Sequence, residues 1–114
     1  NAAHMGPICK WVNNFLAFCL PGQSWTEDDF IGLTAVIGIP WGAQKTKMFA
    51  SMQHYIGFNW DIEAKTVAVP LEKLNAMTAL VDGWFAKDAK FSAHDAQRLH
   101  GKLVHISCIF PLIR

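Results

Sequence analysis

The sequence has few charges and no long hydrophobic run. Only 17% of its 114 residues are charged and the formal net charge is +1, which argues against strong, purely electrostatic binding to nucleic acid. No apolar run reaches the roughly 18 residues of a membrane helix. No charged segment leads into an apolar stretch with a cleavage site, as in a signal peptide. We therefore expect an intracellular protein, cytoplasmic or nuclear, that does not act on a membrane.

Cysteine is also scarce. Cys9, Cys19 and Cys108 are the three cysteines, and none is in a CxxC motif, so they do not form a disulfide framework. Cys9 and Cys19 could face each other across a hairpin. We favour the alternative, three buried thiols in a reducing compartment.

The histidines lack the spacing of a metal site. His94, His100 and His105 lie on or near one predicted helix, without an HxxxH or Cys–His pattern. His94 and His105 are about three helical turns apart and cannot share one ion. We predict no metal and no cofactor, and we expect His105 to be a packed or capping residue.

Apolar residues, by contrast, are abundant. They make up 52% of the chain, which indicates either a dense core or an apolar surface that meets a partner. The length suits one small domain. Residues 1–4, with Met5 after them, resemble a tag scar, so we exclude 1–4 from the fold and expect the natural start at Met5.

The first half of the chain predicts a hairpin and a helix. Residues 8–20 are apolar around Asn13 and Asn14, a pair suited to a two-residue β-turn. Thr26 is a predicted N-cap followed by acidic residues, and Gly38 and Pro40 end that helix.

The second half predicts another hairpin and two helices. Residues 45–49 are a possible short strand, 55–60 a second strand rich in aromatic residues, and 66–69 its partner after the connection 61–65. Pro70 fits the first turn of a helix. Ser92 and Asp95 form a predicted capping box with Phe91 as a hydrophobic staple, and Pro111 ends the last helix. The apolar stripe of the helix after Pro70 is Leu71, Leu74, Met77, Val81 and Trp84. That of the helix after Ser92 is Ala96, Leu99, Leu103, Ile106 and Phe110.

The order hairpin, helix, hairpin, two helices predicts an α+β fold. We expect the two hairpins to form one small antiparallel sheet. Residues 5–69 would make this α+β part and 70–114 the helical part of one compact domain. About four strands make a thin sheet, and at least one edge must be covered or paired.

Five segments resemble, in order, motifs of the reverse transcriptase of fungal, DIRS-like retroelements. Residues 10–16 resemble the aromatic-X-Asp-Asp box of the palm, and 33–45 the next palm motif, which ends at a lysine. Residues 55–61 resemble the Leu-Gly-Phe primer-grip hairpin. Residues 66–70 with Lys73 resemble the strand that enters the thumb. Residues 99–105 resemble the thumb motif Leu-X-Gly-X-Leu-X-His.

The resemblance implies a partial palm, 5–69, followed by a thumb-like region, 70–114. The fingers and the earlier palm motifs would lie upstream of this sequence. Asn13 and Asn14 stand where the family has its metal-binding aspartates. Mg²⁺ prefers charged oxygen ligands, which amides do not supply. We therefore expect no polymerase activity and no catalytic residue, only these two degenerate positions.

The same resemblance gives candidate nucleic-acid contacts. The family pattern would make Lys45 a general acid, and the aromatic side chains could stack on bases. Alternatively, Lys45 is only a surface lysine, and the aromatic rings pack the hairpin against the helices. The basic residues of the C-terminal half could form a modest phosphate-binding face, and a solvated helix surface explains them equally well. They are Lys65, Lys73, Lys87, Lys90, Arg98 and Lys102. The candidates are Lys45, Tyr55, Gly57, Phe58, Trp60, Lys73 and Lys102.

We therefore expect a retroelement-derived, catalytically inactive binding or interaction module. The exposed sheet edge and the apolar content predict a homodimer or a stable protein partner. The alternative is a DNA- or RNA-binding protein that retains backbone contacts, with affinity that falls steeply with salt. A new hydrolase or nuclease activity ranks last, because no convincing site is present.

Overall fold

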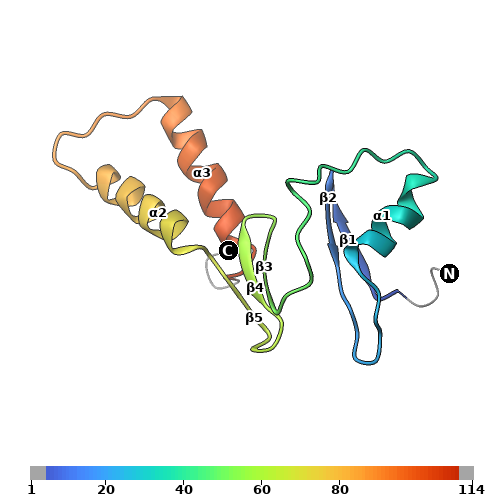
Figure 1. Cartoon of the computed structure of the whole chain (residues 1–114). Helices are drawn as coiled ribbons and strands as arrows, with labels where there is room; N and C mark the ends of the chain where they lie inside the picture. Colours follow the sequence, from blue (N-terminus) through green and yellow to red (C-terminus); the bar gives the residue numbers. More distant parts are fainter. Residues whose placement is uncertain (1–4, 111–114) are drawn as a thin grey trace. The chain divides into compact units, whose positions relative to one another are not determined.

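The computed structural model describes residues 5–110, which excludes the tag-like residues 1–4 and Pro111. Its elements are β1 (Ile8–Trp11), β2 (Asn14–Ala17), α1 (Glu27–Ala35), β3 (Met52–Tyr55), β4 (Phe58–Asp61), β5 (Thr66–Ala68), α2 (Leu71–Trp84) and α3 (Ala93–Ser107) (Figure 1). The α+β class is confirmed. The strands form two antiparallel sheets, β1–β2 and β3–β4–β5, where the sequence predicted a single sheet.

The chain divides into two compact units, Asn1–Ile56 and Gly57–Arg114. The division falls in the turn between β3 and β4, whereas the sequence placed a boundary inside one domain at residues 69 and 70. The observed division lies nearer the N-terminus than this boundary because the strand that begins at Phe58 packs with the helices. The Phe58 ring stacks on His105 of α3.

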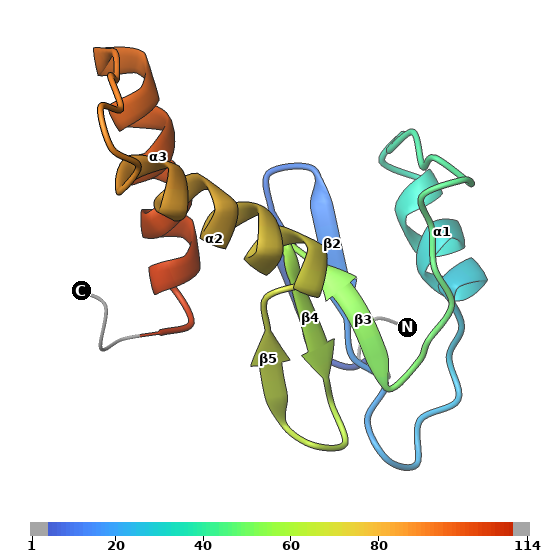
Figure 2. The same ribbon diagram turned by 90° about the vertical axis from the view of Figure 1, so that its left-hand side faces the viewer.

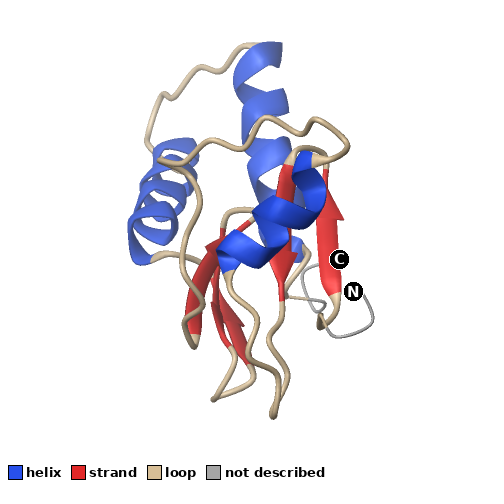
Figure 3. Cartoon of the chain, turned by 45° about the vertical axis from the view of Figure 1, so that its right-hand side comes forward, coloured by secondary structure: helices blue, strands red, loops and turns tan. Residues whose placement is uncertain are grey.

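The first unit is built around a cluster of aromatic rings. Phe15 of β2 packs on Phe30 of α1, with ring centroids 6.0 Å apart, and on Trp41 at 5.1 Å. Trp25, only 8% exposed, packs edge-on against Phe49 at 4.8 Å. Figure 3 shows α1 beside the β1–β2 hairpin that these contacts join.

The first hairpin is confirmed, but its turn lies one residue earlier than predicted. Trp11 pairs with Asn14, so Val12 and Asn13 form the turn. Val12 takes φ +53°, which is unfavourable for a β-branched residue. We attribute this register to the packing of Phe15, which prevails over the local preference of two asparagines for the turn.

Two further predictions for this unit are wrong. Residues 45–49 form no strand; a turn at residues 43–45 leads into irregular backbone, and Phe49 instead packs on Trp25. The prediction of buried thiols also fails, because Cys9 and Cys19 of this unit, and Cys108 of the second unit, are free but exposed. Cys9 pairs with Leu16 across the hairpin, not with Cys19.

In the second unit, the β4–β5 hairpin leads directly into α2, and α3 follows it (Figure 2). The predicted continuous strand 55–60 is interrupted, because Ile56 and Gly57 form a turn between β3 and β4. Both have positive φ, +48° and +87°, as in a type I′ turn. The buried side chains of this unit include Phe58 and Met77, with 3% and 8% exposed.

The predicted helix starts are confirmed by capping geometry. Thr26 and Asp29 form a capping box at α1, and Ser92 and Asp95 form one at α3. The hydrogen bonds that the Ser92 hydroxyl and backbone N–H donate hold the pKa of the Asp95 carboxyl below its usual value. Pro70, predicted within the first turn of its helix, is the N-cap residue just before α2 and makes no side-chain capping hydrogen bond. Phe91, expected as a staple, stacks on Trp84 with centroids 3.8 Å apart.

Candidate functional site

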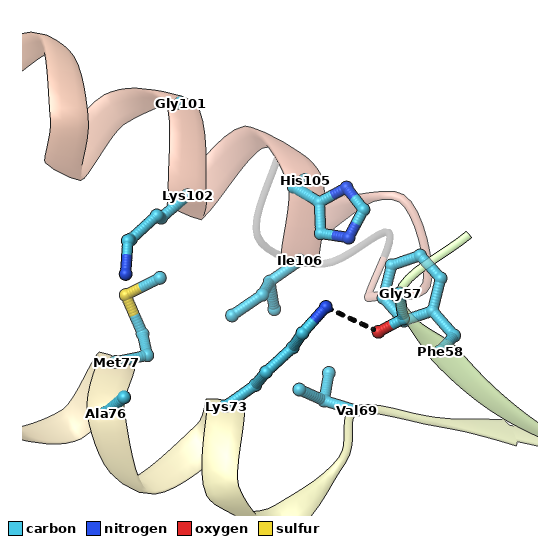
Figure 4. A pocket seen from close by; sticks show the side chains of 10 residues that line it. All are labelled: Gly57, Phe58, Val69, Lys73, Ala76, Met77, Gly101, Lys102, His105 and Ile106. Carbon is cyan, nitrogen blue, oxygen red and sulfur yellow. Dashed lines mark hydrogen bonds between the residues drawn. The ribbon is translucent and has the colours of Figure 1, made fainter. Parts of the chain in front are cut away.

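A cleft of about 280 Å³ lies within the second unit. Its walls come from the start of β4, the end of the β5 segment, α2 and α3 (Figure 4). The lining residues are Gly57, Phe58, Val69, Lys73, Ala76, Met77, Gly101, Lys102, His105 and Ile106. Four of the seven candidate contacts from the sequence, Gly57, Phe58, Lys73 and Lys102, therefore meet in one place.

Lys73 joins α2 to the β4 end of the cleft. Its Nζ donates a hydrogen bond to the Gly57 carbonyl oxygen at 3.3 Å, which Figure 4 shows as a dashed line. A lysine ammonium has three donors, so this bond leaves donors for a ligand.

Gly57 is required here for two reasons. Its φ of +87° is one that residues with a Cβ rarely adopt. A Cβ built on it would lie 2.8 Å from His105 Nε2 and 2.9 Å from Lys73 Nζ. Both nitrogens therefore converge above the same backbone position, and a single ligand group can reach both.

His105 forms the α3 side of this cluster. Its imidazole stacks on Phe58 with centroids 4.7 Å apart and 8° between the planes, so the expectation of a packed histidine is met by this contact. Lys102 lies one helical turn before it on α3, and its side chain extends toward Met77 in Figure 4. His105 is a site residue that was not predicted from the sequence, although its i, i+3 spacing from Lys102 was a usable signal.

Three candidates do not belong to this cleft. Lys45 lies exposed in a turn of the first unit. Tyr55 ends β3 in the same unit, where burial raises the pKa of its phenol and its hydroxyl donates to the Cys9 carbonyl at 3.5 Å. Trp60 is half-buried on β4 but does not line the cleft.

The degenerate positions lie at the tip of the first hairpin. Asn13 is in the turn and Asn14 begins β2, and both are exposed. Among residues 5–110, no group of three or more His, Cys, Asp or Glu side chains is arranged to hold a metal ion. No helix in the described part of the chain is long and apolar enough to cross a membrane.

Comparison of the chain with protein-family models, with curated proteins and with solved structures gave no match. The site is therefore interpreted from its own chemistry. Among its described lining residues are two lysines and a histidine, with no carboxylate, beside an apolar wall. Such a cleft is suited to binding an anionic group, because lysine donors bind phosphate and carboxylate oxygens.

Proposed function

We propose that this protein is a catalytically inactive, retroelement-derived module of the reverse-transcriptase type that acts by binding. The observation that supports a binding role is the convergence of Gly57, Lys73 and Lys102. They come from three separate segments and line one cleft with no acidic side chain among its described lining residues. In the resemblance, these segments correspond to the primer-grip hairpin, the thumb entry and the thumb motif.

The proposed ligand of the cleft is a nucleic-acid backbone. Lys73 and Lys102 supply positive charge, and each phosphate contact made by a lysine releases counterions from the nucleic acid. The net charge of +1 means that affinity depends on this local cluster rather than on the field of the whole chain.

Salt dependence tests this proposal. We expect a labelled primed duplex to bind at low salt, with log affinity falling linearly with log salt concentration. Lys102→Ala should weaken binding and flatten the slope by about 0.9, the contribution of one phosphate contact. Fluorescence anisotropy at several salt concentrations measures both effects.

The control variant is Lys87→Ala. Lys87 is an exposed lysine between α2 and α3 that does not line the cleft, so its loss should leave the slope unchanged. Equal effects of the two variants, or no binding of the unmodified chain at low salt, would contradict a backbone site in the cleft.

Catalytic inactivity is proposed from Asn13 and Asn14. Neutral amide oxygens at the hairpin tip cannot replace the charge of two metal-binding carboxylates. We expect no incorporation of labelled dNTP on a primed template with Mg²⁺ or Mn²⁺. An active polymerase in a parallel reaction shows that the substrates are competent. Incorporation clearly above a control without protein would overturn this part of the proposal.

Self-association is the second candidate function, and exposed apolar side chains favour it. Leu71 and Leu74, three residues apart on α2, are 71% and 44% exposed. Val36 and Ile37, just after α1, are 89% and 72% exposed. Apolar side chains exposed together are typical of interaction surfaces.

Light scattering measures this association. We expect the mass of two chains at micromolar concentration. Burying a leucine contributes about 1.5 kcal/mol or more, which corresponds to roughly tenfold in affinity. If α2 forms the contact, Leu71→Ser with Leu74→Ser should therefore shift the protein toward monomer. A mass of one chain for the unmodified protein would rule out the homodimer.

We also propose an intracellular location. Cys9, Cys19 and Cys108 are free and exposed, and exposed thiols persist in reducing compartments.

A further inference from the structure

The cleft of the second unit also has an apolar wall, which a phosphate backbone alone would not contact. Phe58 and Met77, which are both buried, form part of its lining. Val69, Ala76 and Ile106 extend the apolar wall. A ligand that makes only charged contacts would leave the half-buried side chains of Val69 and Ile106 facing water.

The charged and apolar parts of the cleft lie next to each other. In Figure 4 the Lys73 ammonium lies beside the Gly57 carbonyl oxygen with the His105 ring above them, while Ile106 and Val69 point into the neighbouring space. Lys102 extends along the Met77 side. An anionic group held by the nitrogens would therefore place any attached chain or ring against the apolar wall.

Three nitrogen-bearing side chains line the cleft, two of them at its Gly57 end. Lys73 Nζ and His105 Nε2 both lie within 3 Å of the position where a Cβ on Gly57 would stand. Lys102 brings a second ammonium from α3. A carboxylate or phosphate oxygen accepts such charge-assisted hydrogen bonds.

The size of the cleft limits the apolar part. Its volume of about 280 Å³ is at the lower end of the range for small-molecule sites, which are mostly apolar with a few placed polar groups. A medium-length acyl chain or a single ring fits this range.

We propose that the cleft binds a small amphiphilic anion, with its carboxylate or phosphate on Lys73, Lys102 and His105. Its apolar body packs on Met77, Val69 and Ile106. This site shares the cleft of the proposed function but does not depend on nucleic-acid binding, because its ligand carries its own apolar contacts.

The test uses octanoate as the probe, titrated into the unmodified chain at constant ionic strength and followed by ¹H–¹⁵N NMR. Acetate carries the charge without the chain, and 1-octanol carries the chain without the charge. We expect octanoate to shift the amides of Gly57, Lys73, Gly101 and Lys102, and to bind at least tenfold more tightly than either control. Acetate or 1-octanol within tenfold of octanoate, shifts confined to other residues, or no binding would overturn the proposal.

A variant pair tests the charge separately. Lys102→Gln keeps much of the side-chain length and should weaken octanoate binding at least threefold, while Lys87→Gln should not. Equal octanoate affinity for Lys102→Gln and the unmodified chain would overturn the role of Lys102. Because no nucleic acid is present, this experiment can fail while duplex binding succeeds, and the reverse.

Discussion

Phe58→Ala should destabilise the second unit by about 3–5 kcal/mol, the usual cost of removing a buried phenylalanine side chain. Phe58 is 3% exposed, and its ring stacks on His105 of α3. It therefore joins β4 to the helical part of the unit. Native domains have only about 5–15 kcal/mol of stability in total, so this variant should lose a large part of its stability and unfold at a much lower urea concentration. Urea unfolding followed by circular dichroism measures the change.

Phe85→Ala is the matched control, because it removes the same side chain from an exposed position. Phe85 is 84% exposed, just after α2. Surface substitutions of this kind usually change stability by less than about 0.5 kcal/mol. Similar shifts of the urea midpoint for Phe58→Ala and Phe85→Ala would show that Phe58 is not part of a core.

Gly57→Ala should destabilise the chain by about 1–2 kcal/mol from the backbone alone, since an alanine is strained at φ +87°. The new Cβ would also meet His105 Nε2 and Lys73 Nζ at 2.8 and 2.9 Å. Both side chains would have to move, so the hydrogen bond from Lys73 to the Gly57 carbonyl should be lost. We expect a lower urea midpoint together with weaker duplex binding.

Gly83→Ala is the control for this substitution. Gly83 lies near the end of α2, its φ is not positive, and no atom would contact a Cβ there within 4 Å. Alanine is favoured over glycine in a helix by about 0.5–1 kcal/mol, so this variant should be slightly more stable. A higher midpoint for Gly57→Ala as well would contradict the turn geometry.

Much of the secondary structure could be predicted because its signals are local. Thr26 with Asp29, and Ser92 with Asp95, satisfy the first backbone N–H groups of their helices. These signals need only neighbouring residues. The same holds for the β4–β5 hairpin and for Pro70 before α2.

The failed predictions depended on contacts between distant residues. The turn of the first hairpin lies one residue earlier than predicted, and we attribute this to the packing of Phe15 on Phe30 and Trp41. The expected strand at 45–49 is absent, and Phe49 packs on Trp25 instead. Neither contact has a local sequence signal, because the partners lie 15–26 residues apart in the chain.

The candidate site could be predicted in part. The ordered motifs indicated Gly57, Phe58, Lys73 and Lys102, which line one cleft. They also indicated Lys45, Tyr55 and Trp60, which do not line it. A motif orders residues along the chain, but only the packing of α3 against β4 brings His105 to the same place. The reverse-transcriptase resemblance itself stays a prediction.

The most direct test of the central claim is a ¹H–¹⁵N NMR titration of the chain with a short primed duplex at low salt. If the cleft holds a nucleic-acid backbone, the largest shifts should fall on the amides of Gly57, Lys73, Gly101 and Lys102. The amides around Lys45 and Lys87 should change little. Shifts confined to residues outside the cleft, or no shifts at all, would contradict the account.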